Sequence, residues 1–494
     1  MEVKTLRFHD RCNLQKLENQ TTEIQDRGKC IATCLRPVDG KLKMIKNSPI
    51  GEYLDKSDSM YNKSTLENGI RVVTKTMPEL RSISMGVLID ASLRNESPNK
   101  SGLAHLVEHV MFSGTSNRNI TQIAQLMDEA GGHMGAFTAR DYTCYFATVL
   151  DDYLTYALDL LGDILLNSIF PSDNLEKEKS AILREINTES DMPDQRAHAL
   201  LRAQAWPDHP LGCSIAGRPE TIKSLTREDV IYFVHEHYLP DRFIIAAAGN
   251  LEHEDFVAQV RDAFWRMMGQ SQPSVKTPPV YQSGAIIEHM PVSQTYFSLG
   301  IRAFPYAHPD RYRLHVLNNV LGGGISSRLF RRIRMEQGLA YHIGSDYHAY
   351  CDDGMLVVEG CTAPENFLQV LDLTMDELWK LFNAGELLNE EELWKAKMQI
   401  RGQHLISGEN TNTQMSRIAT QELYFGGHIP DEDILAQIES MNIQALQRFA
   451  GDALRDSLGQ ATVAVVGPKA PDHYNTAQIA ELFAAYHRKG KEGG

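Results

Sequence analysis

The sequence predicts an α+β fold of two homologous domains, each a mostly antiparallel sheet with packed helices. Runs of β-branched residues that indicate strands alternate with segments whose apolar residues recur at helical spacing. The order helix, apolar strand, glycine and helix, which closes around Gly249, is repeated around Gly467. Such an internal repeat indicates that one domain was duplicated.

Two further segments of the first half can be laid on the second half. Residues 102–114, which contain a His-x-x-Glu-His motif, match residues 311–323. The polar residues of the motif fall there on Leu314, Leu317 and Asn318. Likewise, two glutamates within residues 175–186 fall on Ala396 and Gln403. Only the first half therefore keeps residues of the kind that bind a metal.

The length of the chain sets the number of domains. At 494 residues it is too long for one ordinary core, and this size favours about two to four domains. Residues 1–64 are polar without a sustained apolar period, and predict a partly irregular N-terminal extension. We expect the metal-binding domain over residues 65–270 and its homologue over residues 285–494. A Pro-, Ser- and Gln-rich linker near residues 268–285 joins them.

The elements of the first domain follow from two periodicities. Apolar or alternating runs rich in β-branched residues predict strands over residues 67–76, 83–93 and 133–150. Helical spacing of apolar residues predicts helices over residues 97–112, 120–132, 151–168 and 172–191. Ser172 or Asp173 is expected to cap the last of these. A helix, an apolar strand, a glycine turn and a helix within residues 226–264 close the domain.

The composition is typical of a soluble protein, with 42% hydrophobic and 23% charged residues. No stretch approaches the roughly 20 apolar residues that span a bilayer, so no membrane span is expected. The acidic residues among the first 30 argue against a secretory signal or a transit peptide, and predict a cytoplasmic location. The formal net charge of -15 argues against nucleic acid as a partner and favours basic peptides.

The seven cysteines are spread over the whole chain, unlike the dense framework of a small secreted domain. Cys30 and Cys34 have a spacing that is compatible with metal binding. Two isolated thiols are more often free cysteines, which is the interpretation we prefer here.

The segment His105-Leu-Val-Glu-His109 places two imidazoles and a carboxylate on a predicted helix. Residues i and i+4 project from one helix face, and Glu108 lies beside them at i+3. Neutral imidazoles are zinc ligands, and a nearby carboxylate can accept the proton of a water that the metal acidifies. The pattern therefore favours His105 and His109 as ligands and Glu108 as a general base. The alternative is a helix whose histidines pack against the core.

A catalytic zinc site needs a third protein ligand, and the helix predicted over residues 172–191 offers several glutamates. Glu178 and Glu185 lie two helical turns apart and share a face, whereas Glu176 lies on another. The apolar neighbours of Glu185 favour its partial burial, and a buried carboxylate needs a partner. A solvated charged face is the alternative for these glutamates.

With this motif, these glutamates and the two-domain layout, the chain resembles the pitrilysin family of zinc metallopeptidases, the inverzincins. The family pattern is approximately HFLEHMxFxGT, and residues 105–115 are HLVEHVMFSGT. The third ligand of the family lies in a segment like ExExxxIxxEI, which matches EKEKSAILREI at residues 176–186. The resemblance implies that one zinc ion per chain is bound by His105, His109 and Glu185. It also implies that Glu108 is the general base and that Glu178 supports the ligands.

The second half carries a further resemblance, since SSRLFRRIRMEQGLAY at residues 326–341 is similar to the family segment SSRLFxxIRExxGLAY. It implies that Arg334 and Tyr341 hold the substrate and polarise the scissile carbonyl. The family binds peptide as an added strand, along an edge that matches Gly135, Ala136 and Phe137 here. Gly135 stands where the family usually has Asn. This departure bears on the pose and turnover of the substrate and not on the zinc centre.

The resemblance, which covers about residues 65–470, implies a zinc endopeptidase that hydrolyses peptides or unfolded segments bound as extended strands. Peptide processing, leader removal and peptide clean-up are all compatible with it. Family chains of this size pair as homodimers, or with a related subunit, to form a clamshell chamber. The alternative is a non-catalytic or partner-dependent subunit of a heteromeric processing peptidase.

Overall fold

The computed structural model describes four ranges of the chain, which are residues 60–272, 277–382, 388–469 and 473–492. Most of the predicted extension, with Cys12, Cys30 and Cys34, lies outside these ranges. The described residues belong to one compact unit that begins at Leu54. Within them, no helix combines the length and the apolarity that crossing a membrane requires.

The first domain is built on a six-stranded sheet with the order β1-β2-β6-β3-β5-β4. Neighbouring strands are antiparallel except β2 and β6. The strands are β1 (Tyr61–Thr65), β2 (Arg71–Thr76), β3 (Ser82–Ile89), β4 (His133–Thr138), β5 (Thr143–Leu150) and β6 (Phe243–Gly249).

Two details of this sheet differ from the prediction. Regular structure starts already at Tyr61, because the tight turn through Leu66 and Gly69 folds β1 back onto β2. The single strand predicted over residues 133–150 is a hairpin, because the N–H of Ala139 donates to the carbonyl of Tyr142 at 2.8 Å. The hairpin leaves β4 at the edge of the sheet.

The second domain repeats this architecture with a five-stranded sheet of order β7-β11-β8-β10-β9, in which only β7 and β11 are parallel. Its strands are β7 (Gly284–His289), β8 (Thr295–Ala303), β9 (Ala340–Ala349), β10 (Gly354–Thr362) and β11 (Thr462–Gly467). The order matches β2-β6-β3-β5-β4 strand for strand. The prediction of two homologous α+β domains with mostly antiparallel sheets is thereby confirmed.

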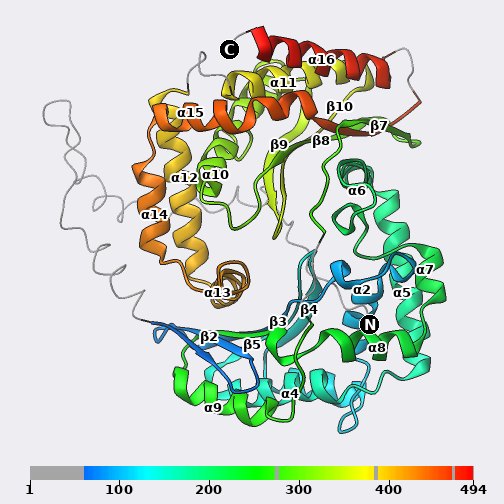
Figure 1. The fold of residues 1–494 in the computed structure, drawn as a ribbon, viewed down its shortest axis with the longest axis vertical. Helices are drawn as coiled ribbons and strands as arrows, with labels where there is room; N and C mark the ends of the chain where they lie inside the picture. Colours follow the sequence, from blue (N-terminus) through cyan, green and yellow to red (C-terminus); the bar gives the residue numbers. More distant parts are fainter. Residues whose placement is uncertain (1–59, 273–276, 383–387, 470–472, 493–494) are drawn as a thin grey trace, which may run out of the picture. The chain divides into compact units, whose positions relative to one another are not determined.

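Helices cover one face of each sheet and bury its apolar side chains, and further helices of the same domain pack on these helices (Figure 1). In the first domain these are α2 (Leu103–Met111), α3 (Ile120–Glu129), α4 (Leu154–Asn167), α5 (Ser172–Asp191), α7 (Pro219–Ser224), α8 (Arg227–His237) and α9 (His253–Phe264). In the second they are α10 (Arg311–Leu321), α11 (Phe367–Phe382), α12 (Glu390–Gly408), α14 (Asp431–Ser440), α15 (Ile443–Leu454) and α16 (Thr476–Glu492). The cap predicted for α5 is wrong, since Pro171 holds the N-cap position without a side-chain hydrogen bond.

The opposite face of each sheet is covered by a helix from the other domain (Figure 1). Helix α6 (Pro193–Ala205) packs on β8 and β11, and α13 (Thr411–Phe425) packs on β2, β3 and β6. All residues of β6 are buried for this reason, because one face meets the core of its own domain and the other meets α13. This exchange was not predicted from the sequence.

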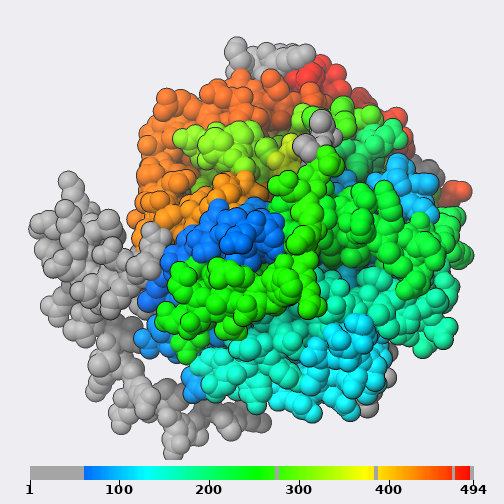
Figure 2. All heavy atoms as spheres, turned by 60° about the horizontal axis from the view of Figure 1, so that its bottom comes forward, coloured from blue at the N-terminus to red at the C-terminus, as the bar shows by residue number. Residues whose placement is uncertain are grey.

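Polar contacts accompany the exchange where β1 and β2 meet the second domain. Figure 2 shows these strands, in blue, against orange residues of the second domain. Lys63 pairs with Glu422 at 2.9 Å, and Lys75 pairs with Asp431 at 2.9 Å. The Lys75 pair is buried on both sides, so its two charges depend on each other.

A second buried ion pair joins the domains through Arg94. Its guanidinium donates to Asp141 at 3.1 Å and also pairs with Asp352 of the second domain. Asp141 further accepts hydrogen bonds from the Tyr424 hydroxyl at 2.9 Å and the Cys351 N–H at 3.0 Å. The β4–β5 hairpin, which contains Asp141, is thereby anchored to the second domain.

The Arg94→Met variant is expected to lose about 3–5 kcal/mol of unfolding free energy, because it leaves the buried carboxylate of Asp141 without its cation. Urea unfolding followed by circular dichroism measures this loss. Arg81→Met, which breaks the exposed pair between Arg81 and Asp151, is the control and should unfold near the parental midpoint. Equal midpoints for both variants would contradict the anchoring role of Arg94.

Candidate metal centre

Helix α2 presents its His-x-x-Glu-His motif on one side, as predicted. The apolar residues next to the polar ones on α2, Leu106, Val107 and Val110, are buried in the core of the first domain. The imidazoles and the carboxylate therefore share the side that is turned away from this core.

The N-terminus of α2 is held by Glu96, a residue that the sequence analysis did not single out. Its carboxylate accepts hydrogen bonds from the N–H groups of Gly102 at 2.9 Å and Ala104 at 2.7 Å. Gly102 has a φ of 92°, and a Cβ there would lie 2.8 Å from the Ala216 carbonyl, so glycine is required. Burial raises the pKa of Glu96 to about 7 against the effect of these hydrogen bonds. The start of the motif helix is thus fixed in place.

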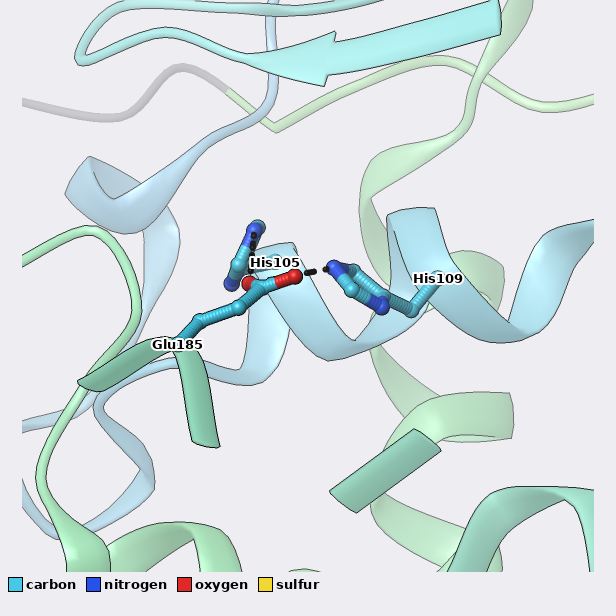
Figure 3. A group of neighbouring side chains, drawn as sticks. All are labelled: His105, His109 and Glu185. Carbon is cyan, nitrogen blue, oxygen red and sulfur yellow. Dashed lines mark ion pairs between the residues drawn. The ribbon is translucent and has the colours of Figure 1, made fainter. Parts of the chain in front are cut away.

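Helix α5 brings Glu185 to both histidines (Figure 3). The Nε2 atoms of His105 and His109 lie 3.9 Å and 3.7 Å from Oε2 of Glu185. One ligand atom from each of the three residues lies within 4.8 Å of the other two. In the described ranges, no other set of three His, Cys, Asp or Glu side chains meets this condition.

Glu178 lies on the same face of α5 as Glu185, two turns before it. It contacts the Nδ1 side of the His109 ring, opposite the Nε2 atom that faces Glu185. The Oε2 atom of Glu178 lies 3.0 Å from Nδ1 of His109. With the proton on Nδ1, this hydrogen bond leaves the lone pair of Nε2 directed towards Glu185. The two glutamates that share a face thus take two different positions around the same imidazole.

The two histidines differ in their electrostatic surroundings. Burial, with a contribution from the nearby His109, lowers the pKa of His105 to about 3. Burial also disfavours the protonated form of His109, but the hydrogen bond to Glu178 and the carboxylates of Glu185 and Glu108 outweigh it and raise its pKa. His105 is therefore a neutral imidazole, whereas His109 sits in a site with an excess of negative charge.

Glu108 lies beside the two histidines and is tied to the edge strand β4. The Thr138 hydroxyl donates a hydrogen bond of 2.6 Å to Oε2 of Glu108. Burial raises the pKa of Glu108, with this hydrogen bond acting against the rise. A carboxylate in these surroundings is a better proton acceptor than one in water.

The donor set fits a zinc ion. Two ligands at ~2.0–2.1 Å on a tetrahedral ion lie about 3.4 Å apart. The two distances to Glu185 are slightly longer than this, and they exceed the range of a hydrogen bond. The buried Nδ1 of His105 has no hydrogen-bond partner, and its ring packs edge-on against that of His109 with centroids 4.6 Å apart. Two neutral nitrogens and one carboxylate oxygen are a composition that catalytic zinc sites use.

Arg334 and Tyr341 lie together in the second domain. Arg334 is in a π-helical segment, η6 (Phe330–Glu336), and its guanidinium lies 5.0 Å from the ring centroid of Tyr341. The ring of Tyr341, at the start of the edge strand β9, is 77% exposed. Among the described residues, no hydrogen bond or ion pair joins either of them to the histidines or to Glu185. The structure thus brings these two residues to each other, without a direct polar contact to the metal ligands in the described ranges.

Gly135, Ala136 and Phe137 lie in β4, whose outer edge has no strand partner in the described part of the chain. The position of β4 next to α2, through Thr138 and Glu108, places this free edge beside the predicted metal ligands. The edge has the hydrogen-bonding groups that an added strand needs.

Comparison with known families finds two models that match consecutive parts of the chain. Residues 71–218 match the model described as insulinase, peptidase family M16. Residues 224–400 match the model described as peptidase M16 inactive domain. The first match contains all three candidate ligands, and the second contains Arg334 and Tyr341.

Several bacterial proteins are similar over most of their length. An uncharacterised zinc protease of Bacillus subtilis is 34% identical over 408 residues, which are 83% of this chain and 99% of the relative. An uncharacterised zinc protease of Mycobacterium tuberculosis is 35% identical over 412 residues, 82% of this chain and 94% of the relative.

Solved structures share the fold at lower identity. A peptidase M16 inactive domain from Pseudomonas fluorescens has a TM-score of 0.77 at 20% identity, covering 83% of this chain and 98% of its own. A chain of complex III from Candida albicans has a TM-score of 0.73 at 18% identity, covering 85% of this chain and 99% of its own. Both chains thus share the fold described above.

Proposed function

The chain belongs to peptidase family M16, and on this premise we propose that it is a zinc-dependent endopeptidase with one zinc ion per chain. The observation that carries the proposal is the meeting of His105, His109 and Glu185 around one point, with Glu108 beside them. The relatives from Bacillus subtilis and Mycobacterium tuberculosis, both named zinc proteases, support it.

The residues of this chain have separate roles in the proposed reaction. When bound by His105, His109 and Glu185, zinc supplies a Lewis acid that acidifies water and polarises a peptide carbonyl. Glu108 takes a proton from the attacking water and passes it to the leaving amine. Thr138 orients the carboxylate of Glu108 through its hydrogen bond of 2.6 Å.

Peptides or unfolded segments are proposed to bind as an extended strand along β4, by hydrogen bonds to Gly135, Ala136 and Phe137. Arg334 and Tyr341 are proposed to clamp the substrate and to stabilise the developing oxyanion. The lack of a polar contact to the metal ligands among the described residues and the exposure of Tyr341 support a site completed by pairing, as a homodimer or with a related subunit. Such pairing would enclose the substrate in a chamber.

Zinc content and cleavage of a peptide library test this function together. The purified chain is dialysed, its zinc is measured, and library products are identified by mass spectrometry with and without a chelator. We expect bound zinc, internal cleavage that the chelator abolishes, and recovery when zinc is restored. A chain that holds no zinc and cuts nothing would contradict the proposal.

A second candidate is a subunit of this fold that is non-catalytic or active only with a partner. Two observations support this second candidate. Gly135 stands where the family usually has Asn, and the fold is similar to that of a chain of complex III. Cleavage by the chain alone decides against it. Zinc binding without cleavage, followed by cleavage once a related subunit is added, would favour the partner-dependent form.

The Glu178→Ala variant is expected to bind zinc about 10–100-fold more weakly, because His109 loses the acceptor that fixes its tautomer and ring orientation. Competition with a chelator of known affinity measures this change. Glu176→Gln is the matched control, since Glu176 lies on the same helix with a side chain that is 69% exposed, and glutamine can still accept the hydrogen bond from the buried Lys179. A zinc affinity of the Glu178→Ala variant equal to that of the parent would show that Glu178 does not support zinc binding.

A further inference from the structure

One row of residues crosses the first sheet towards its free edge. Gly86 of β3 pairs with Phe146 of β5, and Phe146 pairs with Gly135 of β4. Phe146 is therefore a large side chain between two glycines. It lies on the sheet face that also meets α13.

The spaces above the two glycines are filled differently. A Cβ at Gly86 would lie 2.6 Å from Sδ of Met415, so α13 occupies the inner side of Phe146. A Cβ at Gly135 would lie 3.1 Å from Cζ and 3.3 Å from Cε1 of Phe146. The ring of Phe146 thus leans outwards over Gly135, towards the free edge of the sheet. Aromatic rings cover glycines at sheet edges in this way and stabilise the pairing.

Three more rings surround this position. His133 and Phe137 lie 6.2 Å and 6.3 Å from Phe146, and Tyr142 lies 6.0 Å from Phe137, measured between ring centroids. We call His133, Phe137, Tyr142 and Phe146 the aromatic ledge. His133 and Phe137 are exposed, and the other two rings are partly exposed. An exposed aromatic group next to an unpaired strand edge is typical of a binding surface.

We propose that the aromatic ledge is a specificity subsite, which binds a large apolar side chain, preferentially an aromatic one, of a peptide strand added to β4. This inference rests on the proposed endopeptidase function and adds a substrate class to it. In a strand paired with β4, the residue opposite Gly135 has its side chain on the same face as Phe146. Because Gly135 has no side chain, that residue meets the ring of Phe146, with His133 and Phe137 as diagonal neighbours.

The subsite lies at a fixed distance from the proposed site of cleavage. Thr138, which holds Glu108, is three residues along β4 from Gly135, or about 10 Å at ~3.4 Å per residue. Along the bound peptide, the preferred side chain is therefore expected about three residues from the peptide residue that lies next to Glu108. An Asn at position 135, the usual residue of the family, would put an amide where the preferred substrate side chain is proposed to bind.

Two peptides that differ only at this position, with Phe or Ala, test the subsite. A library first locates the position, as the one that is enriched in aromatic residues at a constant distance from the cleaved bond. We expect kcat/KM for the Phe peptide to exceed that for the Ala peptide by roughly tenfold or more. In Phe146→Ala and in Gly135→Asn this ratio should fall to near one. Tyr232→Ala, which removes an exposed ring from α8, is the matched control and should keep the ratio.

Binding separates the subsite from the chemistry. Fluorescence anisotropy of the same peptides with Glu108→Gln should show tighter binding of the Phe peptide, and this difference should vanish when Phe146→Ala is added. Equal cleavage and equal binding of both peptides, or a preference that survives in Phe146→Ala, would overturn the subsite and leave the endopeptidase intact. A binding preference that depends on Phe146, without any cleavage, would support the subsite and contradict the endopeptidase. Thermal melting of each variant confirms that it is folded.

Discussion

The Glu108→Gln variant is expected to hydrolyse peptides with kcat/KM lowered by about 10²–10⁴-fold, the usual contribution of a positioned acid–base group. Glutamine keeps the shape of the side chain and can still accept the hydrogen bond from Thr138, but it cannot take a proton from water. His105, His109 and Glu185 are unchanged, so the zinc content should stay at the parental level. A quenched fluorescent peptide measures the rate, and metal analysis measures the zinc.

Glu176→Gln provides the control for this variant, because Glu176 is an exposed carboxylate of the same domain that pairs with Lys179. It should retain both activity and zinc. Cleavage by Glu108→Gln at the parental rate would show that Glu108 is not the base. Loss of zinc in Glu108→Gln would instead show that Glu108 supports the metal.

The candidate metal centre could be predicted from the sequence because its residues lie close together in the chain within each of two helices. Helical spacing alone puts His105, Glu108 and His109 on one side of α2, and Glu178 and Glu185 on one face of α5. The choice of Glu185 as the ligand came from the resemblance, and the distances of 3.9 Å and 3.7 Å to the histidines agree with it. Glu96 and Phe146 were missed, because their roles depend on tertiary contacts that leave no spacing signal.

The exchange of α6 and α13 between the domains was also missed, because it too depends on tertiary contacts. Neither helix was predicted from the sequence, and helical periodicity does not tell which sheet a helix covers. The continuous apolar run of β6 held the clue, because a strand in a sheet open on one side alternates, whereas β6 is buried on both faces. This run predicted the strand, but a helix covering its second face was not predicted.

The second domain explains why only one half of the repeat has metal-binding residues. Leu314 and Leu317 take the places of His105 and Glu108, and both are buried in the second core. Ala396, in the place of Glu178, is buried as well. The same pair of helices thus either carries polar ligands around a metal or packs apolar side chains, and the second domain has the apolar version.

The Glu185→Ala variant is expected to lose its zinc on dialysis and, with it, all chelator-sensitive peptide cleavage, because only two of three protein ligands remain. The fold should persist, since the Glu185 side chain is 43% exposed and lies beyond hydrogen-bond range of both histidines. Zinc content after dialysis and peptide cleavage measure the loss directly. Thermal melting with added zinc measures it independently of activity.

Melting separates a lost ligand from a damaged fold. A ligand that binds the native state at 100 times its Kd stabilises it by about 2.7 kcal/mol, so zinc should raise the Tm of the parent chain. In Glu185→Ala this rise should vanish, while the Tm without zinc stays near that of the metal-free parent. Glu176→Gln, on the same helix, should keep the full rise. A zinc-dependent rise in Glu185→Ala equal to that of the parent would show that the carboxylate beside His105 and His109 is not a ligand, and the proposed metal centre would have to be abandoned.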